Sequence, residues 1–167
     1  MKLAPEIAEY ERVGLDTSPL IYALDAIEPY VGPARMLLTM AENGELQLFV
    51  SGISELELLV KPLRQDDRGA LRKIRVLLND FPNLHLVPAR REVLQLAAKL
   101  RAKENLRTPD AIIAASAILT GCDCLIGNDR TIQKRLKSIS YLCLDDFVPS
   151  GGSLTGPSET NSEESSK

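Results

Sequence analysis

The sequence predicts an α/β fold, a three-layer α/β/α sandwich around a central, mostly parallel sheet. Three observations predict it. Short apolar runs that suit buried strands alternate along the chain with helix-like stretches. The strand-like runs are apolar throughout rather than at every second position, as expected of a parallel sheet that is covered on both faces. Finally, the stretch at 108–120 is rich in alanine and apolar nearly all round, which predicts a helix packed in the interior.

The first strand is predicted at 13–16, where VGLD is an apolar run that ends in a carboxylate. The residues TSP that follow provide a helix cap and an early proline, and they predict a helix to about residue 27. A second helix is expected at 33–44, because it begins at a proline and ends at a glycine. The apolar run at 46–50 then predicts the second strand.

The next helix is predicted from a capping-box pattern. Ser54 and Glu57 lie three residues apart and predict a helix start at 54, and Pro62 predicts its end. The remaining elements follow from the same apolar patterns. In order they are helix 66–80, strand 84–87, helix 90–103, helix 108–120, strand 122–127, helix 130–137 and strand 141–144.

The length of 167 residues suits one domain with a core large enough to fold without a disulfide or structural metal. We expect a short lead-in at 1–12 and the folded domain at 13–148. The segment 149–167 is predicted to be a disordered polar tail, since Leu154 is its single large apolar residue. These three segments are told apart by their amino-acid composition.

Cysteine usage and hydropathy predict a cytoplasmic protein. The three cysteines, two of them in a CDC segment within an apolar stretch, suggest reduced and buried thiols. His85 is the single histidine and lies far from them in the sequence, so zinc is not expected. No apolar run approaches the roughly 18 residues of a membrane span, and the acidic N-terminus lacks the apolar core of a signal peptide.

The formal net charge of −3 conceals a segregation of charge along the chain. Residues 1–60 carry 3 basic and 10 acidic side chains, whereas residues 61–107 carry 12 basic and 5 acidic ones. This segregation suggests a polyanionic partner for the middle of the chain. Charge alone leaves a second interpretation open, in which the lysines and arginines cover solvated helix faces.

Four acidic residues are predicted at the carboxyl edge of the sheet, where open parallel sheets bind ligands. Asp16 ends the first strand, Glu57 lies in the first turn of its helix, Asp110 near the start of the alanine-rich helix and Asp129 just after the fourth strand. Each has a simpler role open to it, as a helix cap, a capping-box partner, a helix-dipole partner or a turn residue. Together they would repel one another unless a cation neutralised them, and oxygen ligands suit Mg²⁺ or Mn²⁺.

Four segments that contain these acids resemble the four acidic motifs of PIN domains. They are LDTSPLIYAL at 15–24, ISELELLVKPLR at 53–64, RTPDAIIAASAI at 107–118 and LIGNDRTI at 125–132. The resemblance covers about residues 13–148, and TPDAIIAASA is its most specific piece. It extends to the bacterial toxin-type members of the family, the VapC-like ribonucleases.

The resemblance implies that four residues bind the metal and carry catalysis, namely Asp16, Glu57, Asp110 and Asp129. Glu55 competes with Glu57 for the position of the family glutamate, and the spacing to Pro62 favours Glu57. Two positions before the last acid the family usually has threonine or serine, whereas this chain has Gly127.

The chemistry so implied is RNA hydrolysis by a metal-dependent endoribonuclease. Bound Mg²⁺ or Mn²⁺ would activate water and neutralise charge on the phosphate, so no histidine is required as a base. Aromatic residues make up 4% of the chain, and we therefore expect recognition through RNA shape and backbone. The residues expected to contact substrate are Thr17, Ser18, Arg64, Arg107, Asn128 and Arg130.

The likeness to VapC toxins further implies a small antitoxin protein that covers the site, and a homodimer. A PIN-fold module that binds RNA or protein without cleaving is the alternative, and DNA stays open as a substrate. A haloacid-type phosphatase also begins with a strand ending in aspartate. That chemistry needs a second aspartate two positions later, where this chain has Ser18.

Overall fold

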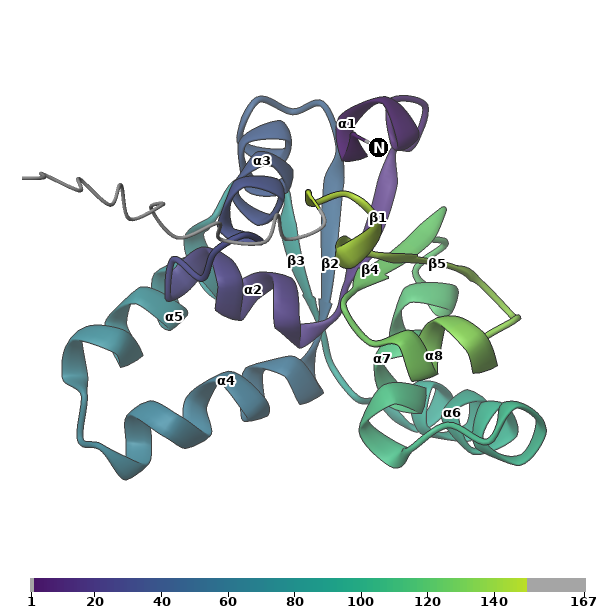
Figure 1. Cartoon of the computed structure of the whole chain (residues 1–167). Coiled ribbons are helices and arrows are strands. Elements are labelled where there is room, and N and C mark those ends of the chain that lie inside the picture. The colour runs from purple at the N-terminus through teal and green to yellow at the C-terminus, as the bar shows by residue number, and fades with distance from the viewer. Residues whose placement is uncertain (1, 150–167) are drawn as a thin grey trace, which may run out of the picture.

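The computed structural model describes residues 2–149 and contains a five-stranded sheet in which all neighbouring strands are parallel (Figure 1). The predicted α/β sandwich is therefore confirmed. The predicted polar tail, apart from Pro149, lies outside the described residues. The strands, in the spatial order β3-β2-β1-β4-β5, are β1 (Arg12–Leu15), β2 (Gln47–Ser51), β3 (Leu84–Val87), β4 (Cys124–Gly127) and β5 (Ser140–Cys143).

Helices cover both faces of this sheet and give the three layers. The helices are α1 (Leu3–Glu6), α2 (Thr17–Leu24), α3 (Val31–Glu42), α4 (Gly52–Arg64), α5 (Arg68–Asp80), α6 (Arg91–Glu104), α7 (Thr108–Leu119), α8 (Arg130–Arg135) and the 3₁₀ turn η1 (Leu144–Asp146). On one face, strand residues such as Val13 and Leu15 form a core with α1 to α5 and η1, and on the other, Leu125 and Tyr141 pack with α6 to α8.

The strand order places a candidate site between β1 and β4. From the central β1, the sheet extends to β2 and β3 on one side and to β4 and β5 on the other. Because the strands are parallel, their carboxyl ends share one edge, and ligands bind where the strand order reverses. In Figure 1, α2 and α4 both begin near this edge.

Helix α7 is buried over most of its length, as its alanine content predicts. It packs closely on β1, where a Cβ added at Gly14 would lie 2.7 Å from the Cβ of Ala117. Asp110 lies in the first turn of the same helix, about two turns before Ala117.

Helix α4 has different ends from those predicted. Ser51 is its N-cap, with the Ser51 hydroxyl accepting from the Ile53 N–H, so the capping-box interpretation of Ser54 and Glu57 is wrong. The helix also continues through Pro62 to Arg64. A proline removes one backbone hydrogen bond from a helix, and near the end of α4, with its ring buried, Pro62 does not stop it.

The segment ahead of β1 contributes to the core. Helix α1 was not expected from the sequence, and Leu3 and Ile7 are buried against the α2–α3 side of the sheet. No helix among residues 2–149 is long and apolar enough to cross a membrane.

Candidate functional site

Asp16 lies at the carboxyl end of the central strand and caps the helix that follows. Its backbone N–H donates to the Ile126 carbonyl at 2.9 Å, which continues the β1–β4 pairing beyond the strand. Its Oδ1 accepts from the Thr17 N–H at 2.7 Å and is the N-cap of α2. Capping α2 occupies only Oδ1 of the carboxylate, so Asp16 can cap the helix and still offer Oδ2 to a ligand.

Glu57 is held beside the start of α2. The Thr17 hydroxyl donates to Glu57 Oε2 and lies 3.0 Å from the Ser54 hydroxyl. Thr17 and Ser54 are buried, which fixes the end of the Glu57 side chain. Of the two glutamates considered from the sequence, Glu57 is the one that Thr17 contacts. Because α4 begins at Gly52, Glu57 lies in its second turn and not in the first as predicted, where Glu55 lies instead.

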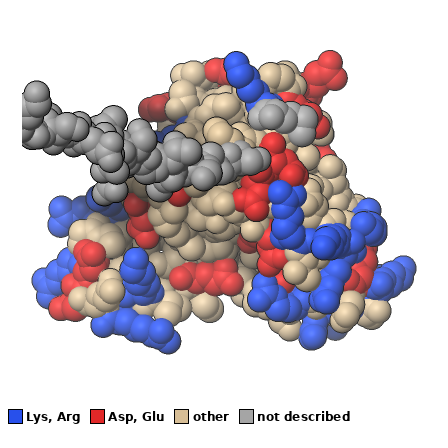
Figure 2. Space-filling view, viewed as in Figure 1, with Lys and Arg blue, Asp and Glu red and all other residues tan. Residues whose placement is uncertain are grey.

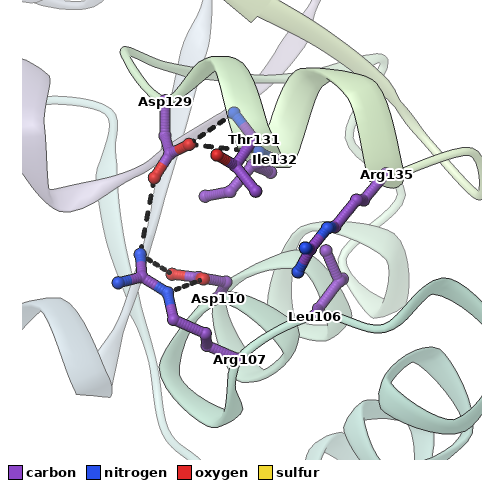
Figure 3. Close-up of a pocket in the computed structure, with 7 residues that line it drawn as sticks. All are labelled: Leu106, Arg107, Asp110, Asp129, Thr131, Ile132 and Arg135. Carbon is purple, nitrogen blue, oxygen red and sulfur yellow. Dashed lines mark hydrogen bonds and ion pairs between the residues drawn. The ribbon is translucent and has the colours of Figure 1, made fainter.

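Asp110 and Asp129 are joined by an arginine. Arg107 Nε lies 2.8 Å from Asp110 Oδ2, and Arg107 Nη2 lies 3.4 Å from Asp129 Oδ2 (Figure 3). Asp129 is also the N-cap of α8, because its Oδ1 accepts from the backbone N–H groups of Thr131 and Ile132. The hydrogen bond to Asp110 raises the pKa of Arg107, which therefore stays charged.

The negative charges of the other three acids act on the carboxyl group of Asp16. Burial raises the pKa of Asp16 to about 6, and the charges of Asp110, Glu57 and Asp129 add to the increase, against the Thr17 N–H, which lowers it. Fold geometry thus brings carboxylates from four distant segments within electrostatic reach of one another. Like charges gathered in this way raise the affinity of a site for cations.

Tyr141 belongs to this site, although the sequence analysis did not single it out. Its hydroxyl accepts from the Asp129 N–H at 3.1 Å and donates to Asp16 Oδ2 at 3.5 Å. A Cβ added at Gly127 would lie 2.1 Å from that hydroxyl. The missing side chain at 127 was the signal in the sequence, but the residue that fills the space comes from another strand.

The expected substrate-contacting residues fall into two groups. Thr17 and Arg107 contact the acids directly, and Ser18 follows Thr17 in the first turn of α2, where its hydroxyl is buried without a hydrogen-bond partner among the described residues. The other three have different surroundings. They are Arg64, exposed in the last turn of α4, Asn128, whose amide bonds Tyr22 and the Asp145 N–H, and Arg130, which pairs with Asp145 and Asp146.

The donor chemistry of the site fits a hard divalent cation. All four acids offer carboxylate oxygens, and the guanidinium of Arg107 already binds two of them as a cation. Within residues 2–149, no group of three or more His, Cys, Asp or Glu side chains is arranged to hold a metal ion. Arg107, whose side chain is 71% exposed, contacts both Asp110 and Asp129, so a cation bound by these two acids would have to compete with it.

Two hollows adjoin the acids. One of about 220 Å³ lies beside Asp110 and Asp129 and is lined also by Arg107, Thr131 and Arg135 (Figure 3). The second, of about 480 Å³, runs between α2, α4 and α5 from Glu57 along residues that include Lys61 and Lys73. Figure 2 shows basic side chains gathered on either side of the lower face, with acidic groups between them. The acids are thus flanked by positive charge.

The family model of the PIN domain matches residues 13–137 of the chain. No curated protein matches the sequence. Solved structures are similar in fold at low identity. VapBC-1 of nontypeable Haemophilus influenzae is 18% identical with a TM-score of 0.62, covering 80% of this chain and 98% of that one. VapBC2 of Rickettsia felis, bound to a DNA fragment from its promoter, is 17% identical with a TM-score of 0.61, covering 79% and 98%.

A third similar structure is that of a toxin. VapC20 of Mycobacterium tuberculosis, described as cleaving the sarcin–ricin loop, is 14% identical with a TM-score of 0.58, covering 77% of this chain and 98% of its own. At these identities the three structures support the fold.

Proposed function

Because the chain belongs to the PIN domain family, we propose that it is a metal-dependent endoribonuclease that hydrolyses RNA phosphodiester bonds. The observation that carries the proposal is the placement of the buried Asp16 at the carboxyl end of the central strand, within electrostatic reach of Glu57, Asp110 and Asp129; burial, with the charges of these three acids added, raises the pKa of Asp16. Perturbed carboxylates at the ligand-binding edge of a parallel sheet are typical of catalytic sites.

The four acids would hold one or two Mg²⁺ or Mn²⁺ ions. When bound, such ions lower the pKa of water and neutralise charge that builds up on the phosphate. Thr17 orients the Glu57 carboxylate, and the Thr17 N–H holds Oδ1 of Asp16. Arg107, once it leaves Asp110 and Asp129, lies at the rim of the site with its charge free to bind a phosphate oxygen of the substrate.

The basic surroundings support RNA as the substrate. Lys61 and Lys73 line the hollow that begins at Glu57, and Arg135 lines the hollow at Asp129. A strand laid across the site would therefore meet positive charge on both sides of the acids, which neutralises its phosphates without reading its sequence. The acids themselves would repel that strand unless a cation occupied the site.

We further propose that the protein is the toxin of a cytoplasmic toxin–antitoxin pair. An exposed apolar stripe on α4, formed by Leu56, Val60 and Leu63, supports a protein partner, because these side chains are three and four residues apart and share one helix face. The partner would be a small antitoxin, and a second copy of the chain could form a homodimer. One of the solved structures similar in fold is described as a toxin–antitoxin complex from Klebsiella pneumoniae.

Cleavage assays on the full chain test the enzymatic proposal. We expect RNA cleavage in Mg²⁺ or Mn²⁺ that stops in EDTA and is abolished in Asp16→Asn. The matched control is Asp80→Asn, which removes an exposed carboxylate at the C-terminal end of α5 and should leave cleavage intact. RNA binding without cleavage at any metal concentration would instead support the non-catalytic module, and cleavage of DNA alone would reassign the substrate.

A further inference from the structure

Tyr141 reaches the site from the neighbouring strand. Residue 141 of β5 lies opposite Leu125 of β4, so Gly127 is its diagonal neighbour toward the carboxyl edge. The Tyr141 ring is 7% exposed and packs in the apolar core with Ile132 and Leu136 of the α8 segment. Because the ring is fixed by this packing, its hydroxyl is held at one point at the edge of the sheet.

That hydroxyl connects two of the four acids. It donates to Oδ2 of Asp16, the oxygen that the α2 cap leaves free, and it accepts from the backbone N–H of Asp129. A phenol keeps its proton at neutral pH, so this hydroxyl can donate one hydrogen bond while it accepts another. The ends of β1 and β4 are thereby bridged by one side chain.

Gly127 leaves the space that the Tyr141 hydroxyl occupies. A Cβ at position 127 would lie 2.1 Å from the Tyr141 hydroxyl and 2.7 Å from Asp16 Oδ2, far inside van der Waals contact. The absence of a side chain on Gly127 is therefore what allows the phenol to reach between Asp16 and Asp129.

We propose that Tyr141 is a positioning residue, which sets the distance and orientation of Asp16 relative to Asp129 through its hydroxyl and depends on Gly127 for the space it occupies. In the proposed nuclease, on which this inference rests, it would preorganise two of the four metal-binding carboxylates. Outer hydrogen bonds of this kind typically change metal affinity or activity by about 10- to 100-fold.

The test compares Tyr141→Phe with Tyr22→Phe. The Tyr22 hydroxyl accepts from Asn128 Nδ2 at 3.1 Å, so the control removes a hydroxyl beside the same β4–α8 loop without touching an acid. We expect Tyr141→Phe to weaken Mn²⁺ binding by about 10-fold or more in calorimetry without RNA, and to lower kcat while KM for RNA stays the same. Tyr22→Phe should match the wild type in both.

A second measurement does not depend on metal or RNA. Hydrogen exchange of the Asp129 amide, followed by NMR, should become several-fold faster in Tyr141→Phe, because this N–H loses its acceptor, and should not change in Tyr22→Phe. Unchanged exchange, or Mn²⁺ binding equal to that of the wild type, would overturn the inference. A wild-type chain that neither binds Mn²⁺ nor cleaves RNA would refute the proposed nuclease, while the exchange result still decides the bridge.

Gly127→Ala checks the steric half of the proposal. Alone it should destabilise the protein in urea unfolding, since its Cβ would overlap the Tyr141 hydroxyl. In the Tyr141→Phe background the loss should be smaller, because the overlap with the phenol oxygen is gone while those with Oδ2 and Cβ of Asp16 stay. Equal losses in both backgrounds would show that the phenol does not occupy this space.

Discussion

Replacing Asp16 with asparagine should make the metal-free protein more stable at neutral pH while it removes a catalytic carboxylate. Burial and three neighbouring acids raise the pKa of Asp16 from 3.8 to about 6. The folded protein therefore holds a proton that the unfolded chain has already lost between about pH 4 and pH 6. Stability contributed by this group is present at low pH and is lost as the pH rises through 6.

The size of the effect follows from the shift. About two pKa units at 1.36 kcal/mol each correspond to a loss of up to about 3 kcal/mol between pH 4 and pH 7. Asparagine carries no such charge, yet its side-chain oxygen can still accept from the Thr17 N–H and cap α2. The stability of Asp16→Asn relative to the wild type should accordingly rise by as much as about 3 kcal/mol over this pH range.

The assay is urea unfolding followed by circular dichroism in EDTA at several pH values between 4 and 7. Asp80→Asn, which removes an exposed carboxylate at the C-terminal end of α5, should show no comparable trend. At pH 7, added Mn²⁺ should stabilise the wild type, because it binds the folded state, and should stabilise Asp16→Asn far less. A stability difference between Asp16→Asn and the wild type that is the same at pH 4 and pH 7 would refute the argument.

Three further outcomes are expected. Arg107→Gln should tighten Mn²⁺ binding in calorimetry without RNA, since the guanidinium competes for Asp110 and Asp129, whereas Arg130→Gln should not; equal effects would point to long-range charge alone. Lys73→Gln should weaken RNA binding and reduce its salt dependence by roughly one counterion, measured by fluorescence anisotropy at several salt concentrations, and an unchanged slope would remove this hollow from the RNA path. Gly14→Ala should cost roughly 1–3 kcal/mol in urea unfolding, because its Cβ would overlap Ala117; a neutral result would mean that α7 can shift.

Much of the fold could be predicted because its signals are local. Continuous apolar strands, an alanine-rich helix and capping residues each depend on a few neighbouring positions, and the all-parallel sheet confirms what they imply. The errors in predicting α4 fall at its two ends. Two serines lie near its start, and Ser51 caps it while Ser54 is buried inside it. At the other end the helix continues through the buried Pro62 to Arg64.

The sequence predicted which carboxylates would gather at the candidate site, but not the hydrogen bonds and ion pairs that hold them there. Asp16, Asp110 and Asp129 each lie next to the end of a strand or the start of a helix, so the topology of a parallel sheet brings them to one edge. Glu57 lies in the second turn of α4, which begins at the same edge. Membership of the PIN domain family confirms the resemblance carried by those four segments. Their roles as ligands and catalysts stay a proposal.

The sequence by itself determined the architecture, the edge at which acids gather and the excess of positive charge in the middle of the chain. Tertiary structure decided which side chains meet there: the Arg107 bridge between Asp110 and Asp129, the hold of Thr17 on Glu57, and the reach of Tyr141 over Gly127. The physical reason is that apolar periodicity accumulates over many residues and tolerates error. A hydrogen bond between distant segments depends instead on strand register and side-chain packing to within an ångström or less, and neither is written in any single stretch of the chain.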